Sequence, residues 1–525
     1  MRLAPYSSRY APGAMVCAVD HLAASAGVAV LRSGGNAADA AVATSAVLAV
    51  TTQHMCGMGG DLFALVQAGG TARPVALNSS GRAGSGADPE ALRAEGHARM
   101  PATGDIRAVP VPGCVDGWLA LHGRFGRLAL AEVLEPARRY AAEGFPASPT
   151  LAAAAGRVAG LPGGEAFRAA TAPGATVRRP GVARALQAIV ESGRDGFYLG
   201  EFGEGLLALG GGEYAEPDLA TASAEFVEPV AVDAFGARIW SVPPNSQGYL
   251  TLAGAAIADG LGLPDPDDPL WAHLTIEAAR QAAYDRYDVL HEHADGTALL
   301  AEARLAERRS RISPTRAAVL GDSYAEGGTI YLCAVDEDRM AVSLIQSNAG
   351  GFGAGIAEER TGIFLQNRGI GFSLEAGHPA EYGPRRRPVH TLSPALVTTP
   401  DGRLSAVLGT MGGDTQPQIL LQLLARLLGA GESAGDAVAA PRWALSNRLD
   451  PGGFTTWAKG GELEVELEQG VPEGWPEALA ARGHRVGPLQ PMSHGFGHAH
   501  VIALTGDNLE GASDPRALGG AAAGY

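Results

Sequence analysis

The sequence predicts a layered α/β sandwich in which both halves of the chain share a core of β-sheet. Two observations support this fold class. Helical patterns dominate the chain up to about residue 310, whereas strands paired with helices follow residue 329. No internal repeat, low-complexity linker or hinge rich in proline and serine divides the 525 residues. We therefore expect one globular unit rather than domains joined by a tether.

Two helices come first in the chain. Apolar residues at helical spacing predict a helix over residues 21–32, which ends at the Ser-Gly-Gly-Asn run 33–36. A second, alanine-rich helix begins at Asn36 or Asp39 and runs toward Val50. Alanine side chains are short, so we expect this helix to lie closely against a neighbouring layer such as a sheet.

Strands and further helices follow. Residues 62–66 and 75–78 have the apolar pattern of two paired strands, and the first of them follows a glycine turn. The middle of the chain, residues 101–310, is predicted to be mainly helical with breaks at prolines. Within it we expect a strand over residues 238–242 and a long helix over residues 273–291.

The pattern changes to strands after residue 329. Residues 329–335 and 341–346 flank a charged turn, as in a hairpin. Further strands are predicted over residues 361–365, 395–398 and 405–408, and the glycine cluster 409–413 then leads into a helix from about 416 to 428.

Composition excludes several classes of partner. The net charge of −16 argues against a surface for nucleic acid or an anionic membrane, since both need basic stripes. The first residues lack the apolar core of a secretion signal, and no stretch of eighteen residues is uninterruptedly apolar. We expect a soluble, cytoplasmic protein. Four widely spaced cysteines are expected to be small buried residues in a reducing compartment: Cys17, Cys56, Cys114 and Cys333.

Some motifs favour structural roles. Residues 431–435 match GxSxG, but a helical pattern precedes them where a nucleophile elbow needs a strand, so Ser433 is better explained as a helix N-cap. His494, His498 and His500 have no carboxylate or cysteine at ligand spacing, and structural histidines are the better explanation. The glycine clusters do not follow the patterns that bind nucleotides.

Thr329 carries the sharpest chemical hypothesis. It follows two glycines and opens a predicted strand, where a self-cleaving precursor would expose a new amino terminus. A threonine with a free α-amino group carries nucleophile and base on one residue. The alternative is a plain hairpin strand entered through a glycine turn. Similarly, Gly412 and Gly413 lie between a strand and a helix, where their amides either stabilise an oxyanion or simply form a turn.

Several motifs together resemble the γ-glutamyltransferase family of N-terminal-nucleophile hydrolases. They occur in order through the chain: GGNAADA at 34–40, GMGG at 57–60, VPG at 111–113, PPNSQG at 243–248, RP at 387–388 with SP at 393–394, GG at 412–413, and the ending 511–525. The resemblance implies a proenzyme cut between Gly328 and Thr329. It implies a mostly helical large subunit, 1–328, and a catalytic small subunit, 329–525, folded as one four-layer αββα sandwich. A further dimer of that pair is left open.

The resemblance also implies site roles without a metal or organic cofactor. Thr329 Oγ attacks the substrate carbonyl and its own α-amine takes the proton. Ser347 orients the nucleophile, and the amides of Gly412 and Gly413 hold the oxyanion. Arg82 aligns with the arginine that binds the substrate α-carboxylate, for which a guanidinium fork is well suited.

The sequence departs from the family where a γ-glutamyl group would bind its ammonium. The family's second threonine is Ile330 here, the acid that binds the α-amine aligns with Gly371, and its polar companion aligns with Arg368. Losing an acid and gaining an arginine favours an acidic substrate without an ammonium group. In this respect the chain resembles the branch that contains oxamate amidohydrolase and glutaryl-cephalosporin acylases.

The remaining substrate contacts also differ. A family asparagine aligns with Ala349, next to Asn348, and the paired serines that bind the α-carboxylate align with His390 and Thr391. Three functions therefore stay open. The default is hydrolysis or transfer of γ-glutamyl groups, as in glutathione hydrolases. The first alternative is hydrolysis of another small anionic amide, of the oxamate or glutaryl type. The second is a non-catalytic relative that keeps the fold for binding.

Overall fold

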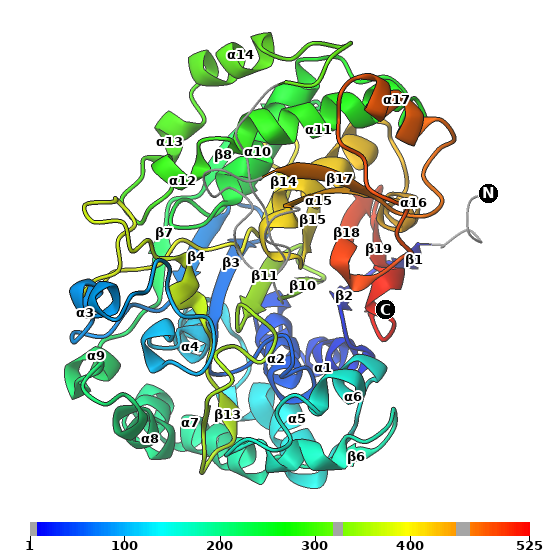
Figure 1. The fold of residues 1–525 in the computed structure, drawn as a ribbon. Coiled ribbons are helices and arrows are strands. Elements are labelled where there is room, and N and C mark those ends of the chain that lie inside the picture. Colours follow the sequence, from blue (N-terminus) through cyan, green and yellow to red (C-terminus); the bar gives the residue numbers. More distant parts are fainter. Residues whose placement is uncertain (1–7, 319–328, 448–461) are drawn as a thin grey trace.

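The computed structural model describes residues 8–318, 329–447 and 462–525. Within these residues, two seven-stranded antiparallel sheets lie face to face, and helices cover both outer faces (Figure 1). The predicted four-layer αββα sandwich is therefore confirmed. Each sheet contains strands from before and after residue 329, so the two halves of the chain share one core.

The first sheet has the strand order β20-β2-β10-β11-β3-β4-β7. Its strands are β2 Met15–Ala18, β3 Asp61–Gln67, β4 Val75–Ser79, β7 Glu225–Val227, β10 Ile330–Val335, β11 Ala341–Ser347 and β20 Ala521–Gly524. The predicted hairpin is β10–β11, in which Ile330 lies opposite Gln346, and the predicted pair β3–β4 is also formed. β10 and β11 are buried along their whole length, which explains their continuous apolar runs.

The second sheet has the order β1-β19-β18-β15-β14-β9-β8. Its strands are β1 Arg9–Ala11, β8 Val230–Ala234, β9 Ala237–Ser241, β14 Ala395–Thr398, β15 Leu404–Thr410, β18 Ala499–Thr505 and β19 Asn508–Ser513. Tyr331 and Phe63 from the first sheet share a buried cluster with Trp240 and Ile502 from the second. Gly409 of β15 makes room for Tyr331, because a Cβ there would lie 2.2 Å from the tyrosine ring.

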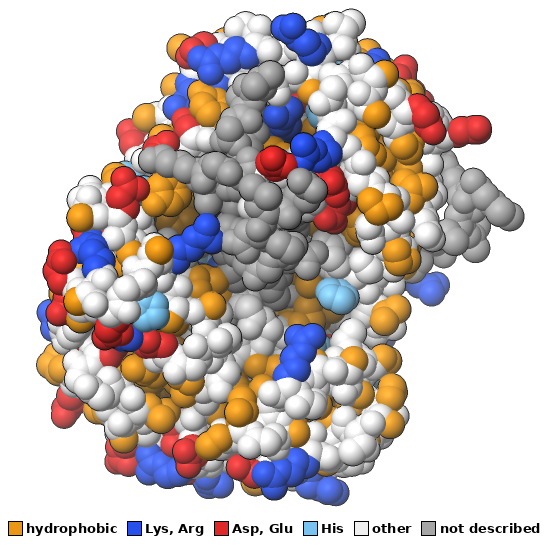
Figure 2. Space-filling view, in the orientation of Figure 1, with side chains coloured by type: hydrophobic (Ala, Val, Ile, Leu, Met, Phe, Trp, Pro, Cys, Tyr) orange, Lys and Arg blue, Asp and Glu red, His pale blue; other side chains and the backbone are white. Residues whose placement is uncertain are grey.

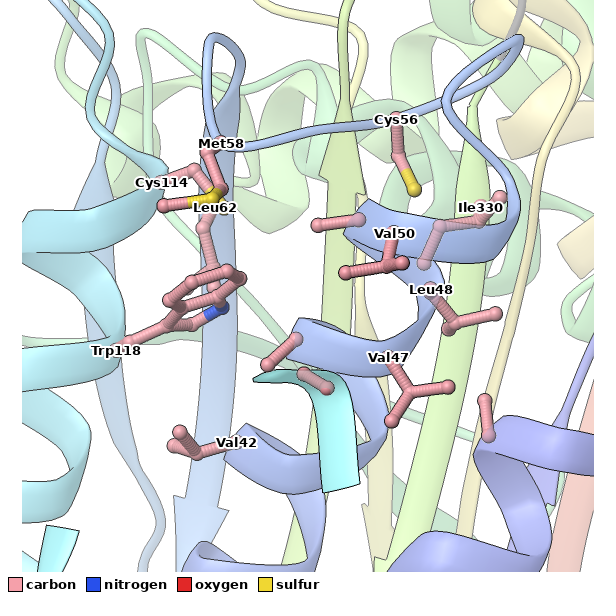
Figure 3. Packing of buried hydrophobic residues seen from close by; sticks show 14 of the residues in the cluster. Val42, Val47, Leu48, Val50, Cys56, Met58, Leu62, Cys114, Trp118 and Ile330 are labelled. Atoms are coloured by element: carbon pink, nitrogen blue, oxygen red, sulfur yellow. The ribbon is translucent and has the colours of Figure 1, made fainter. Parts of the chain in front are cut away.

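One helical layer covers the first sheet. It contains α1 His21–Arg32, α2 Ala37–Thr51, α4 Cys114–Phe125, α5 Leu130–Glu143, α7 Pro180–Tyr198 and α8 Glu201–Leu209. The alanine-rich helix begins as predicted, since Asn36 caps α2 in a capping box with Asp39. Every residue of α2 is buried, and Figure 3 shows its side chains beside Ile330. This packing fixes the start of β10, directly after Thr329.

The other helical layer covers the second sheet with α10 Gly248–Asp259, α11 Pro269–Ala283, α14 Glu302–Ser310, α15 Gln416–Leu424, α16 Ala434–Ala439 and α17 Trp475–Ala481. The predicted helix over residues 273–291 was wrong in extent. α11 ends at Ala283, and a separate α12 Arg286–Val289 follows. Distant partners favour this break, because Asp285 accepts hydrogen bonds from α14 while Arg286 turns inward to Asp414.

The remaining elements are short: α3 Pro89–Ala94, α6 Pro149–Ala155, α9 Glu216–Ala220, α13 Gly296–Leu299, β5 Phe145–Pro146, β6 Thr176–Val177, β12 Ala357–Glu358, β13 Ile363–Phe364, β16 Trp443–Asn447 and β17 Leu463–Leu467. The strand predicted over 361–365 is reduced to β13, since Gly362 turns the chain with φ 66°. The helix predicted to reach 428 passes into a π-helical turn, Ala425–Gly429.

Two structural interpretations are confirmed, the helix cap at Ser433 and the burial of the cysteines. Ser433 caps α16, where its side chain accepts a hydrogen bond from the Asp436 amide. All four cysteines lie in the described residues, are buried and carry no disulfide. Acidic and basic side chains are scattered over the face seen in Figure 2 and form no basic stripe there. In the described part of the chain no helix is long and apolar enough to cross a membrane.

Candidate active site

The predicted nucleophile and its orienting hydroxyl meet at one end of the first sheet. Thr329 is fully buried just before β10, and its Oγ1 lies 3.0 Å from Oγ of Ser347, the last residue of β11. The hairpin register causes this contact. Ile330 lies opposite Gln346, so Thr329, just before Ile330, comes next to Ser347, just after Gln346. Gly328, the other predicted cleavage residue, lies outside the described residues.

Ser347 is held by two N–H donors. Its Oγ accepts hydrogen bonds from the Ala349 amide, at 2.8 Å, and from Nη2 of Arg368, at 3.1 Å. A hydroxyl has two acceptor positions and one proton. Oγ1 of Thr329 lies within hydrogen-bond range of Ser347 Oγ, and either hydroxyl can be the donor. Ser347 is therefore placed to polarise the threonine hydroxyl.

Arg368 is the charged centre of the site. Its side chain is fully buried, and its Nη1 donates to Oγ1 of Thr391 at 3.0 Å while Nη2 reaches Ser347. Burial lowers the pKa of Arg368 to about 10, and the charges of Asp61 and Asp414 oppose that shift. The guanidinium remains protonated at neutral pH. The structure thus links Arg368 and Thr391, both predicted to bind substrate, through Ser347 to the predicted nucleophile.

The glycine pair lies at the end of β15. Gly412 has φ 133° and Gly413 has φ 56°, a backbone that favours glycine. Their carbonyls have partners, since Thr415 donates to Gly412 O and Gln247 Nε2 donates to Gly413 O at 3.0 Å. Among the described residues neither amide donates a hydrogen bond. The same Gln247 amide also donates to Thr391 O at 3.1 Å, which links the glycine turn to the arginine.

A cavity of about 430 Å³ opens beside Arg368 and Thr391. Besides Arg368 and Thr391, its charged and polar lining residues are His97, Arg99, Arg286, Tyr287, Ser373, Glu375 and His378, whereas Leu290, Ile370, Phe372, Leu374 and Val389 supply apolar walls. Arg286 Nη2 donates to Oδ1 of Asp414 at 3.1 Å, one residue beyond the glycine pair. The cavity therefore joins a cationic end near the glycine pair to an apolar region.

Sequence reasoning missed Arg286 and Asp414. An acid directly after two glycines at a strand end was a signal that could have identified Asp414. Arg286 gave no comparable signal, because its position looked like the interior of a long helix. Its inward direction depends on the end of α11, which contacts from distant segments decide.

Three predicted substrate residues point to other partners. Arg82 pairs with Glu225 at 3.2 Å and with Glu292 at 3.3 Å, and about a third of its side chain is exposed. Asn348 Nδ2 donates to Gln53 O at 3.2 Å. None of the three, His390 included, lines the cavity as the described residues define it.

His390 is a buried supporting residue. Its Nε2 lies 3.1 Å from Oδ2 of Asp61, whose Oδ1 accepts hydrogen bonds from the Gly81 and Gly113 amides. Burial, aided by the nearby charge of Arg368, lowers the pKa of His390 to about 3. The ring is therefore neutral at pH 7. It connects the loop that carries Thr391 to the first residue of β3.

The αββα fold is that of the N-terminal-nucleophile hydrolases, and a buried threonine lies directly before β10. The model of the gamma-glutamyltranspeptidase family matches residues 23–524, and the chain belongs to this family of amidohydrolases and transpeptidases.

Three known proteins are similar to this chain over almost its whole length. The oxamate amidohydrolase proenzyme of Klebsiella pneumoniae is 35% identical over 548 residues, covering 99% of this chain and 100% of the relative. The glutathione hydrolase-like YwrD proenzyme of Bacillus subtilis is 34% identical, covering 97% and 98%. A crystal structure of a cephalosporin acylase from Bacillus halodurans has 33% identity and a TM-score of 0.88, covering 99% of this chain and 97% of the acylase.

Proposed function

We propose that this chain is a proenzyme that cuts itself before Thr329. The mature enzyme then hydrolyses a small amide that carries a free carboxylate. The observation that carries the proposal is Arg368. Its buried guanidinium lies one hydrogen bond from Ser347, which in turn contacts Thr329. A fixed positive charge so close to the nucleophile attracts a substrate carboxylate and repels the ammonium of a γ-glutamyl group.

Gly371 supports the same preference. This residue occupies the position of the family's ammonium-binding acid. A Cβ built on Gly371 would lie 2.2 Å from the Val389 carbonyl oxygen and 3.3 Å from Cβ of Pro388. Real Cβ atoms do not approach backbone that closely, so an acid here would require the neighbouring chain to move. The ammonium partner is missing, and the backbone fills the space it would need.

The residues support a stepwise amide hydrolysis. Once the bond before it is cut, Thr329 has a free α-amine, which titrates near ~7.7–8.0 and can take the Oγ1 proton at working pH. The Oγ1–carbon bond forms while Gly412 and Gly413 amides hold the oxyanion. The amine then protonates the leaving nitrogen as the carbon–nitrogen bond breaks, and water releases the acid from the acyl-enzyme. Each oxyanion donor is worth about 2.7–4 kcal/mol of barrier.

The relatives supply candidate substrates. One is called an oxamate amidohydrolase and another a cephalosporin acylase, which supports an acidic amide for this chain. The YwrD relative is called glutathione hydrolase-like, which keeps γ-glutamyl hydrolysis or transfer as the second candidate. We further propose that residues 1–328 and 329–525 become the large and small subunits, since the relatives are named proenzymes.

A matched substrate pair tests the proposal. Glutaryl-p-nitroanilide and γ-glutamyl-p-nitroanilide differ only in the α-ammonium group, and oxamate hydrolysis is followed by ammonia release. We expect the mature enzyme to hydrolyse an acidic amide with a kcat/KM about 100-fold above that for the γ-glutamyl substrate, because one charged contact is worth a few kcal/mol. Equal or better turnover of the γ-glutamyl anilide would show the proposed preference to be wrong. An intact chain without turnover would favour the binding relative.

A further inference from the structure

We propose that Arg286 is a second carboxylate-binding residue and that, with Arg368, it selects monoamides of dicarboxylic acids. This inference rests on the proposed function and narrows its substrate class. Arg368 alone does not define this substrate class, because its guanidinium also holds Ser347 and Thr391. Arg286 adds a guanidinium at the same cavity whose donors are largely unused.

The hydrogen bonding of Arg286 is incomplete for a buried cation. The side chain is only 10% exposed. Among the described residues its one hydrogen bond runs from Nη2 to Oδ1 of Asp414, and Nε is buried without a partner. A guanidinium has five N–H donors in a planar fork. Leaving such donors unpaired inside a protein is costly, so the arrangement indicates a ligand that supplies acceptors.

The cavity specifies the chemistry of that ligand. Arg99, Arg286 and Arg368 line it, and Glu375 is the acid among the lining residues that the structure describes. Asp414 takes up one donor of Arg286, and Nε of Arg286 is buried without a partner among the described residues. A planar carboxylate matches a guanidinium fork with two parallel bonds. The ligand that fits is an anion with carboxylate geometry.

The same cavity offers space for a carbon chain. Its apolar walls include Leu290, Ile370 and Phe372, next to the cationic end. A substrate whose free carboxylate lies between Arg286 and Arg368 would rest its methylene groups on these walls. Binding at Arg286 is also coupled to the glycine turn, because its partner Asp414 directly follows Gly413. The acid is thus recognised one ion pair away from the proposed oxyanion amides.

Kinetics with a second matched pair test the assignment. Glutaryl-p-nitroanilide and pentanoyl-p-nitroanilide differ by the terminal carboxylate. Arg286→Met should lower kcat/KM for the glutaryl substrate about 10- to 100-fold more than for the neutral substrate, mainly through KM. Arg286→Lys should recover part of the loss. Arg139→Met, which removes an exposed charge on α5, should match the unmodified enzyme on both substrates.

Two kinetic results would overturn the proposal. An equal loss on both substrates would mean that Arg286 only supports Asp414 and the glycine turn. No loss on the glutaryl substrate would mean that Arg286 does not touch the acid. Subunit pattern on gels and the melting temperature confirm that each variant is processed and folded, and Arg286→Lys provides the comparison if Arg286→Met does not mature.

Binding separates this inference from the proposed function. Calorimetry with glutarate needs no turnover, so it reports on Arg286 even if neither anilide is cleaved. We expect the mature protein to bind glutarate and Arg286→Met to bind it at least about 10-fold more weakly, as loss of a charged hydrogen bond implies. Absent binding to the unmodified protein, or equal binding by the variant, would refute the carboxylate site.

Discussion

Replacing Arg368 with methionine separates its charge from its bulk. Methionine keeps an unbranched, flexible side chain of similar volume, but it removes the donors to Ser347 and Thr391. Two effects on stability then oppose each other, and their sizes follow from the structure. The effect on catalysis has no such compensation.

The stability terms nearly cancel. Burial lowers the pKa of Arg368 to about 10, which corresponds to about 3 kcal/mol of cost for the buried charge that methionine relieves. Against this gain, two buried hydroxyls each lose a donor, at about 1–3 kcal/mol apiece. We therefore expect the free energy of unfolding to change by no more than about 3 kcal/mol, which is a few degrees of melting temperature for a protein of this size.

Activity should change much more. One charge-assisted hydrogen bond to a substrate carboxylate is worth about 1.5–3 kcal/mol, or about 10- to 150-fold in kcat/KM. Arg368→Met should lose at least this factor on glutaryl-p-nitroanilide and much less on γ-glutamyl-p-nitroanilide, so the ratio of the two rates falls. Arg368→Lys should retain part of the ratio. A loss shared equally by both anilides would refute the reasoning, because both carry the carboxylate and Arg368 would then not discriminate against the ammonium group.

Three further predictions follow from other residues. Thr329→Ala should remain a single chain of 53.6 kDa on gels, whereas the lighter fragment of the unmodified protein should begin Thr-Ile-Tyr-Leu; cleavage of the variant would contradict the nucleophile assignment. Gly371→Ala should lower the free energy of unfolding by about 1–3 kcal/mol, since its Cβ meets Val389 O, whereas Gly123→Ala in α4 has open space and should not destabilise; equal melting temperatures would count against the close approach. The free energy of unfolding should fall as pH drops below about 6.5. Burial makes the pKa of several histidines lower in the folded chain than in the unfolded chain, so in this range only the unfolded chain takes up protons. Each such histidine should cost about 1.4 kcal/mol of stability by pH 5.5. A flat melting profile between pH 7.5 and 5.5 would contradict this. The histidines concerned have pKa values lowered to about 3 or 4: His54, His390, His484, His498 and His500.

Local patterns gave much of the fold. The capped helix after Asn36, the hairpin that follows Thr329 and the cap at Ser433 were all predicted, because caps and strand alternation depend on residues within a few positions of one another. The helix over 273–291 was wrong in extent for the opposite reason. Its end depends on Asp285 and Arg286 and on partners distant in the sequence.

The candidate site could also be predicted from the sequence only in part. Motif order placed Thr329, Ser347 and Arg368 in one family pattern, but their contacts needed the folded hairpin and the loop after it. The structure directs Arg82 to Glu225 and Glu292 rather than to the cavity, and no local pattern could indicate that choice.

The sequence by itself determined the family, the αββα architecture and the hydroxyl residue just before the strand. Periodicity and motif order depend only on the order of residues, so they can be recognised without the folded structure. Only the tertiary structure decided which charges surround that hydroxyl. Arg286 and Asp414 are 128 residues apart and meet only when the two halves of the chain fold together. The substrate selectivity that we propose depends on such pairs, because burial and distance, not residue type alone, set the strength of an electrostatic interaction.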